Sequence, residues 1–143
     1  MPQIMQQQRA SFALKGVEKA KKELPNDQHK EYHSHVSALP FMIHASGLGQ
    51  AAAFYRSKVD KKDYQLIYQL LSDWLSQPKQ PFCKTDSSGK IKPLDLLEGI
   101  TQSDMHTYLA AQAEAMVFMN WVKLFANAFM KESTTKTSEG IHS

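Results

Sequence analysis

The sequence predicts an all-α protein, a compact bundle of about five to six helices. Apolar residues recur every three or four positions along most of the chain, as they do on one face of a helix. We find no stretch in which apolar and polar residues alternate over the length of a strand. Prolines and glycines divide the chain into segments of helical length. At 143 residues, the chain suits one domain with a single core.

The first helix is predicted over residues 3–24. It should end before Pro25, because proline cannot continue a helix and restricts the residue that precedes it. A second helix is expected to begin near Asp27. Pro40 should break it or change its direction, because proline removes one helical hydrogen bond.

Beyond Pro40, residues 41–46 are predicted to form a short continuation that ends at Gly47. A left-handed helix end favours a residue without a β-carbon, which explains the glycine. A short third helix is expected over residues 48–57. A fourth over residues 61–76 should be capped by Asp60, since aspartate is a preferred N-cap residue.

Two more helices are predicted in the last third of the chain. Residues 93–99 begin with a proline and end with a glycine, the usual asymmetry of a short helix. The last helix should be capped by Thr101 or Ser103 and run to about Lys131. It is expected to be the longest helix and largely buried.

Residues 105–130 are mostly apolar, well beyond the stripe that an ordinary surface helix buries. Two explanations stay open at this point. The helix is the centre of the bundle, or part of its apolar surface belongs to a protein partner.

The domain prediction is a single helical bundle over residues 1–131. Within it, residues 77–92 contain prolines, a glycine and several lysines, and they are expected to form a flexible, exposed loop. Residues 132–143 are small and polar, which predicts a disordered tail.

Composition favours a cytoplasmic protein. Cys83 is the only cysteine, so the chain has no internal disulfide, and a lone thiol suits a reducing compartment. The first residues do not resemble a secretory signal. The apolar stretch at 110–130 contains Glu114 and Lys123, and a charged residue at the centre of a membrane helix costs about 2.5–3.5 kcal/mol. No membrane association is therefore expected.

No residue pattern in the chain predicts catalysis. His29 and His33 are spaced to share a metal ion and His35 lies nearby, but the spacing fixes no third ligand. The segment TDSSGK at residues 85–90 lacks the leading glycine and the final Ser or Thr of a phosphate-binding loop. Cys83 has no histidine placed by sequence to activate it. We therefore expect no catalytic site, no metal and no cofactor, with a metal enzyme built on the three histidines as a distant alternative.

The net charge of +3 is unevenly distributed. Residues 1–92 contain 14 Lys or Arg against 8 Asp or Glu, whereas residues 93–143 contain 3 against 6. A basic half of this kind suits an anionic partner, of which nucleic acid is the commonest, although such an excess also occurs on solvated surfaces.

Three groups of basic residues stand out. Lys15, Lys19 and Lys22 share one face of the first predicted helix, opposite its apolar face. The other two groups lie at a helix junction and in the predicted loop: Arg56, Lys58, Lys61 and Lys62, then Lys79, Lys84, Lys90 and Lys92. Phe12 and Tyr55 lie beside these groups and can either stack on a base or belong to the core.

Three blocks of the sequence resemble a known family. They are RASFALKGVEKAKK at 9–22, YHSHVSALPFMIHASGLGQAAAFYRSK at 32–58 and MHTYLAAQAEAMVFMNWVKLFANAFM at 105–130. Together they cover nearly half of the chain in the right order. The chain resembles the small all-helical subunit of the type III-B CRISPR effector, the RNA-targeting Cmr complex.

The resemblance implies a non-catalytic role in antiviral defence. In that family, several copies of the small subunit stack into a short filament beside the backbone subunits that hold the guide RNA. They line the groove where target RNA pairs. Cleavage belongs to the backbone subunits and signalling to the large subunit. The implied partners are therefore backbone and large subunits, further copies of this chain, guide RNA and target RNA.

Charge pattern and resemblance together predict a surface that faces the guide and target duplex. Its residues are expected to be Arg9, Lys15, Lys19, Lys22, Arg56, Lys58 and Lys123. Most are lysines, which bind phosphate as point charges, so each contact should be weak and the contacts additive. The alternative function is a helical protein-interaction adaptor without RNA binding.

Overall fold

The computed structural model describes residues 4–130, which form five α-helices and one short 3₁₀ helix. In chain order the elements are α1 (Met5–Glu23), the 3₁₀ helix η1 (Asn26–Gln28), α2 (His29–Arg56), α3 (Lys62–Leu75), α4 (Leu96–Gln102) and α5 (Met105–Phe129). Within these residues, β pairing is limited to an isolated antiparallel bridge between Thr85 and Ile91. The all-α prediction is confirmed.

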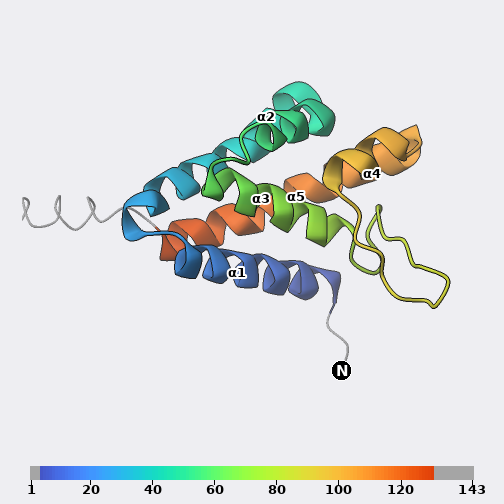
Figure 1. Ribbon diagram of the computed structural model, residues 1–143, viewed down its shortest axis with the longest axis horizontal. Helices are drawn as coiled ribbons and strands as arrows, with labels where there is room; N and C mark the ends of the chain where they lie inside the picture. Colours follow the sequence, from blue (N-terminus) through green and yellow to red (C-terminus); the bar gives the residue numbers. More distant parts are fainter. Residues whose placement is uncertain (1–3, 131–143) are drawn as a thin grey trace, which may run out of the picture.

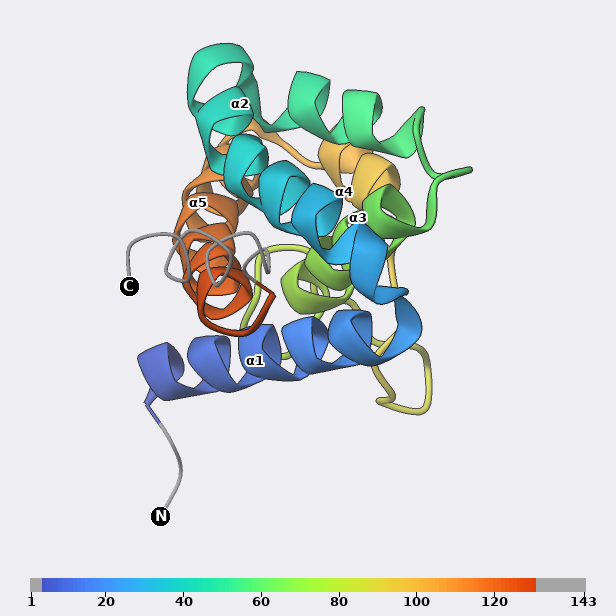
Figure 2. The same cartoon turned by 90° about the vertical axis from the view of Figure 1, so that its left-hand side faces the viewer.

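The helices form a bundle in which α3 and α5 lie between α1 and α2 (Figures 1 and 2). α5 packs against α1, α2 and α3, while α4 contacts α2 and α3. The connection between α3 and α4 lies at the same end of the bundle as α4 (Figure 1). No helix in the described part of the chain is long and apolar enough to cross a membrane.

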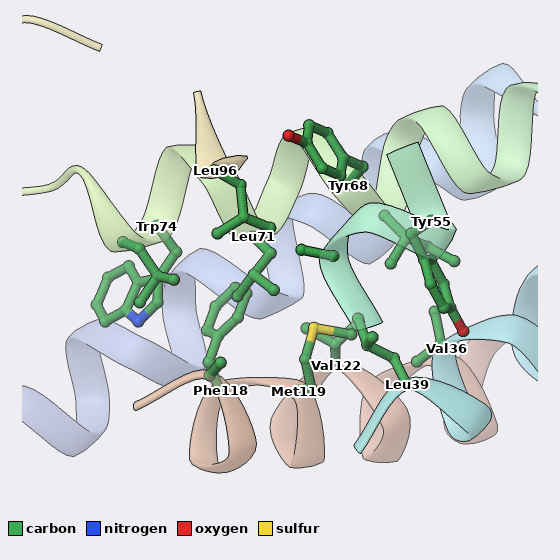
Figure 3. Close-up of a cluster of buried hydrophobic side chains, with 14 of the residues drawn as sticks. Val36, Leu39, Tyr55, Tyr68, Leu71, Trp74, Leu96, Phe118, Met119 and Val122 are labelled. Carbon is green, nitrogen blue, oxygen red and sulfur yellow. The ribbon is translucent and has the colours of Figure 1, made fainter. Parts of the chain in front are cut away.

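The core contains a cluster of packed aromatic rings contributed by three helices. Trp74 of α3 stacks on Phe118 of α5 with ring centroids 5.3 Å apart, and Phe12 of α1 lies 5.2 Å from the Trp74 ring. Figure 3 shows Trp74 and Phe118 at one end of the core, with Val36 and Tyr55 at the other. Such pairs contribute about 0.5–1.5 kcal/mol each beyond the area that they bury.

α5 is buried on one side only. Its buried residues are Ala111, Ala115, Phe118, Met119, Val122 and Ala126. Its other side exposes the large apolar side chains of Leu109, Val117 and Leu124, and Met105 and Phe129 are exposed at its two ends. Core packing therefore accounts for only part of the apolar excess that the sequence shows in this helix.

Pro40 does not interrupt the second helix, and the prediction of a break there was wrong. α2 continues through Pro40, whose side chain is buried between Leu39 and Ile43 in a row of core positions. Proline removes one backbone hydrogen bond from a helix. A helix held by packing on its neighbours tolerates that loss, because packing supplies most helix stability in proteins.

The chain changes direction at Gly47, where the sequence predicted the end of a helical segment. Gly47 has φ +87° and ψ 158°, a kink that divides α2 into two helical arms, so the separate helix predicted after Gly47 is confirmed and ends at Arg56. The amides that follow the kink are satisfied by α5. The Leu48 amide donates to Gln112 Oε1 at 2.9 Å, and the Gly49 amide donates to the Tyr108 hydroxyl at 3.0 Å.

Helix starts were predicted less well than helix bodies. α3 starts at Lys62 with Lys61 as its N-cap residue, so Asp60 does not cap it. α5 is capped by Asp104, whose Oδ1 accepts from the Thr107 amide at 2.8 Å, and not by Thr101 or Ser103. Several polar residues lie before each helix, and the local pattern does not decide between them.

α4 is shifted from its predicted position at 93–99. It starts after Asp95, whose Oδ2 accepts from the Leu97 amide at 3.1 Å and from the Tyr68 hydroxyl at 2.9 Å. Gly99 lies inside this helix and does not end it. A glycine is needed there because a β-carbon would lie 2.5 Å from the ring of Phe82.

The segment at 77–92 is exposed over most of its length but is attached to the bundle. Phe82 is 3% exposed and Gln80 is buried. At the tip, Asp86 accepts from the Ser88 hydroxyl and from the Lys90 amide, and these hydrogen bonds lower the pKa of Asp86. The flexibility of this loop stays a prediction. The predicted tail at 132–143 lies outside the described residues.

Gly47 and Gly49 provide a matched test of the kink. Gly47→Ala should lower the free energy of unfolding by about 1–3 kcal/mol, because alanine strongly disfavours a φ of +87°. Gly49→Ala should be neutral or stabilising by up to about 1 kcal/mol, because alanine favours helix and a β-carbon there meets only ordinary contacts. Urea unfolding measures both, and equal effects would contradict the assigned kink.

Candidate nucleic-acid interface

The lysine stripe of α1, defined as Lys15, Lys19 and Lys22, lies on the solvent side of this helix. All three side chains are exposed, whereas Ala13 and Val17 are completely buried on the other side. Positions four and three residues apart share one helix face, which explains the alignment. The predicted amphipathic character of the first helix is confirmed.

A groove runs between α1 and α3 beside this stripe and has a volume of about 360 Å³. From α1 it is lined by Phe12, Lys15, Gly16, Lys19 and Glu23, and from α3 by Lys62, Gln65, Leu66, Gln69, Leu70 and Asp73. Two of the three lysines of the stripe therefore border a concave surface. We call it the α1–α3 groove.

Glu23 lies between Lys62 and the lysine stripe. Glu23 Oε1 lies 3.3 Å from Lys62 Nζ, and Glu23 Oε2 lies 3.9 Å from Lys19 Nζ. These side chains are well exposed, so the ion pairs contribute at most about 1 kcal/mol each. The sequence placed Lys62 in the basic group at the helix junction, and only the packing of α3 on α1 places it beside Lys19.

Arg9 is held inside the bundle by Glu114 of α5. Its Nε donates to Glu114 Oε2 at 2.5 Å and its Nη2 donates to Glu114 Oε1 at 2.9 Å. Trp74 Nε1 also donates to Glu114 Oε2, at 2.9 Å. The arginine and glutamate side chains are only 15% and 14% exposed, and the hydrogen bonds to Glu114 raise the pKa of Arg9. Arg9 therefore has a structural partner and does not belong to the surface proposed below.

The three remaining predicted RNA-binding residues do not line the α1–α3 groove. Arg56 is exposed at the end of α2. Lys58 follows in the next turn, and its Nζ lies 5.6 Å from the centroid of the Phe54 ring. Lys123 is exposed on α5.

Phe12 and Tyr55, the two aromatic residues considered for stacking on a base, lie in different environments. Tyr55 is a core residue that is 2% exposed, and its hydroxyl donates to the His35 carbonyl at 2.6 Å. Burial raises its pKa, so its hydroxyl stays protonated. Phe12 belongs to the core through Trp74, yet it also lines the α1–α3 groove. Only Phe12 is placed to meet a ligand there.

The histidines at 29, 33 and 35 do not form a metal cluster. His29 Nε2 is 3.0 Å from the Leu24 carbonyl oxygen, and His35 Nδ1 is 2.5 Å from Asp63 Oδ2. Among residues 4–130, no group of three or more potential ligands is arranged to hold a metal ion. The metal-enzyme alternative has no geometric support in this part of the chain.

The family model described as CRISPR-associated protein (Cas_Cmr5) matches residues 5–129, which is nearly the whole chain. This chain belongs to the Cmr5 family. Cmr5 proteins are the small helical subunits of the type III-B Cmr complex and associate with its other subunits. The family predicted from the three sequence blocks is confirmed.

A solved structure has the same fold. It is the X-ray crystal structure of a CRISPR-associated Cmr5 family protein from Thermus thermophilus. The two chains superpose with a TM-score of 0.70 and 24% sequence identity, over 90% of this chain and 100% of that one. At this identity the likeness shows that the Cmr5 fold is shared.

Removing the Glu114 carboxylate should destabilise the bundle. Glu114→Ala leaves the Arg9 guanidinium and the Trp74 indole N–H without their acceptor in a poorly solvated site. We expect a loss of about 2–4 kcal/mol in the free energy of unfolding by urea. Glu18→Ala, on the exposed side of α1, is the control and should change stability by less than about 0.5 kcal/mol. A similar small loss at both positions would contradict a structural role for the pair.

Proposed function

We propose that this chain is a non-catalytic small subunit of a type III-B CRISPR effector complex, in which it helps to hold guide RNA and target RNA. Several copies stack into a filament beside the backbone subunits, in the cytoplasm, for antiviral defence. Membership of the Cmr5 family over residues 5–129 is the observation that carries this proposal.

The exposed basic surface supports the RNA-holding role. Lys15, Lys19 and Lys22 present three cations on one side of α1. Lys62 adds a fourth from α3, beside Lys19. Lysines arranged in this way contact phosphates without reading bases. A subunit that must accept any guide sequence needs binding of this kind, with Arg56, Lys58 and Lys123 as further candidate contacts.

The exposed apolar side of α5 supports packing on other protein chains. Leu109 is 51% exposed, Val117 43% and Leu124 59%. Exposed apolar patches on small proteins commonly mark interaction sites. We assign this surface to contacts with neighbouring copies and with the backbone subunits.

The same α5 surface also favours the second candidate, a helical adaptor that binds proteins without RNA. Both functions need exposed apolar residues, so these residues do not discriminate between them. RNA affinity that falls with salt distinguishes the two, because an adaptor with merely solvated lysines shows none.

The deciding experiment is purification of the tagged chain from its native host at moderate salt, with identification of the proteins and sequencing of the RNA. Recovery of backbone and large CRISPR subunits together with repeat-derived guide RNA would support the effector-subunit role. Recovery of neither, from cells shown to express the locus, would refute it and favour the adaptor.

Charge reversal on α1 should weaken RNA binding by the assembled complex. The variant Lys15→Glu, Lys19→Glu, Lys22→Glu is expected to lower affinity for target RNA at all sequences. The slope of log K against log salt should fall by about 0.7–0.9 for each lost phosphate contact. The matched control reverses three loop lysines, Lys84, Lys90 and Lys92, and changes the net charge equally. Equal loss in both variants would show a general charge effect and no specific role for α1.

Charged residues on α5 should prevent assembly. Val117→Glu with Leu124→Glu should leave the fold intact, because both side chains are exposed, but should abolish co-sedimentation with neighbouring subunits. Ile91→Glu, at another exposed apolar position in the loop, is the control and should assemble normally. Normal assembly of the double variant would remove α5 from the interface.

A further inference from the structure

The α1–α3 groove continues into a second hollow along α1. This second hollow has a volume of about 380 Å³. It is lined by residues of α1, the end of α3 and the turn that follows: Gln8, Ser11, Phe12, Lys15, Trp74, Gln77, Pro78 and Lys79. Because Phe12 and Lys15 line both hollows, the two form one extended groove with Phe12 at its midpoint.

Cations outnumber carboxylates along this extended groove. Its rim carries Lys15, Lys19, Lys62 and Lys79. One of the two carboxylates, that of Glu23, lies between the ammonium groups of Lys19 and Lys62 at the distances given above. The excess positive charge favours an anionic ligand that follows the length of α1.

The other carboxylate belongs to Asp73. Its Oδ1 accepts a hydrogen bond from Gln69 Nε2 at 2.8 Å. A carboxylate has about four acceptor sites, so Asp73 retains the capacity to accept from a hydroxyl or an amine. RNA offers such a donor at every nucleotide in its 2′-hydroxyl.

The floor of the groove is apolar. Phe12, Leu66 and Leu70 line it, and all three are partly buried. Gly16 lets the floor lie close to the α1 backbone, because a β-carbon there would lie 2.5 Å from the Leu70 side chain. An aromatic ring within an apolar floor, flanked by lysines, is the arrangement with which proteins bind single-stranded nucleic acid.

We propose that the extended groove binds a single-stranded segment of RNA, with phosphates along the lysine rim and one base against Phe12. This inference rests on the proposed function and adds a binding mode to it. A paired nucleotide stacks inside the duplex and cannot reach the floor, so the ligand is an unpaired nucleotide of guide or target RNA. The size of the groove suits one or two nucleotides, since pockets of about 300–1,000 Å³ hold small ligands.

An acidic protein segment fits the groove less well. A docked amphipathic helix needs a continuous apolar strip for its anchor residues. Here Gln65, Gln69 and Asp73 of α3 lie among the lining residues and interrupt the apolar floor. Amide and carboxylate groups in these positions suit the hydrogen-bonding edges of a base and a ribose.

Photo-crosslinking in the assembled complex tests the position of the base. Guide and target RNAs carry 5-iodouridine at one position at a time, and the complex is irradiated and digested with trypsin. Cleavage after Arg9 and Lys15 releases residues 10–15, in which Phe12 is the only aromatic residue. We expect an RNA adduct on this peptide from an unpaired position. Adducts found only on peptides that do not line the groove would overturn the proposal.

Matched substitutions test the contribution of the groove to affinity. Phe12→Leu keeps an apolar side chain and should weaken target binding by about fivefold or more. Phe41→Leu makes the same change at a phenylalanine that is 73% exposed on α2, and it should have no effect. Lys62→Gln should lower the salt slope by about 0.7, whereas its neighbour Lys61, which does not line the groove, should tolerate the same change. Thermal unfolding of each variant checks that the fold is retained.

The outcomes separate this inference from the proposed function. Suppose that Phe12→Leu and Lys62→Gln bind target RNA as tightly as the wild type while charge reversal on α1 still weakens binding. The proposed RNA site in the extended groove is then wrong, and the RNA-holding role stands. If all of these variants bind RNA normally, both fail. If Lys15 or Lys62 crosslinks chemically to an acidic segment of another subunit while RNA binding is unchanged, the occupant is protein and the proposal is overturned.

Discussion

One carboxylate, that of Glu114, ties three helices of the bundle together. It accepts two hydrogen bonds from Arg9 of α1 and one from the indole of Trp74 of α3, and it lies on α5 itself. Charge-assisted, bidentate pairing of this kind fixes orientation as well as distance. The rings of Phe12, Trp74 and Phe118 pack together nearby, so polar and apolar contacts set the same arrangement of α1, α3 and α5.

The proposed RNA surface depends on that arrangement. The lysine stripe lies on α1, whereas Lys62 and most of the groove floor lie on α3. A shift of α1 by one turn, about 5.4 Å, would separate Lys19 and Glu23 from Lys62. Arg9 thus contributes to the surface indirectly, by holding the helix that carries the lysines.

The sequence predicted what depends on local pattern. The buried and exposed faces of α1, the core positions of α3 and the glycine at the kink follow from helical period and backbone freedom. The partner of Arg9 could not be predicted, because Glu114 lies 105 residues away and helix packing alone brings the two together. The effect of Pro40 was predicted wrongly for a related reason. The one backbone hydrogen bond that proline removes costs less than the packing of α2 on its neighbours contributes, and this packing is not visible in the local sequence.

The two proposed surfaces are compatible because different helices supply them. The α1–α3 groove has no lining residue from α5. The exposed apolar residues Leu109, Val117 and Leu124 all lie on α5. A copy or backbone subunit packed on this side of α5 therefore leaves the α1–α3 groove open to RNA, whereas Lys79, at the other end of the extended groove, lines a hollow together with Val117 of α5. The distribution of charge along the chain is consistent with this separation of the two surfaces. α1, α2 and α3 belong to the basic residues 1–92, and α5 belongs to the acidic remainder. A small bundle can in this way join a protein filament through one helix and contact RNA through two others.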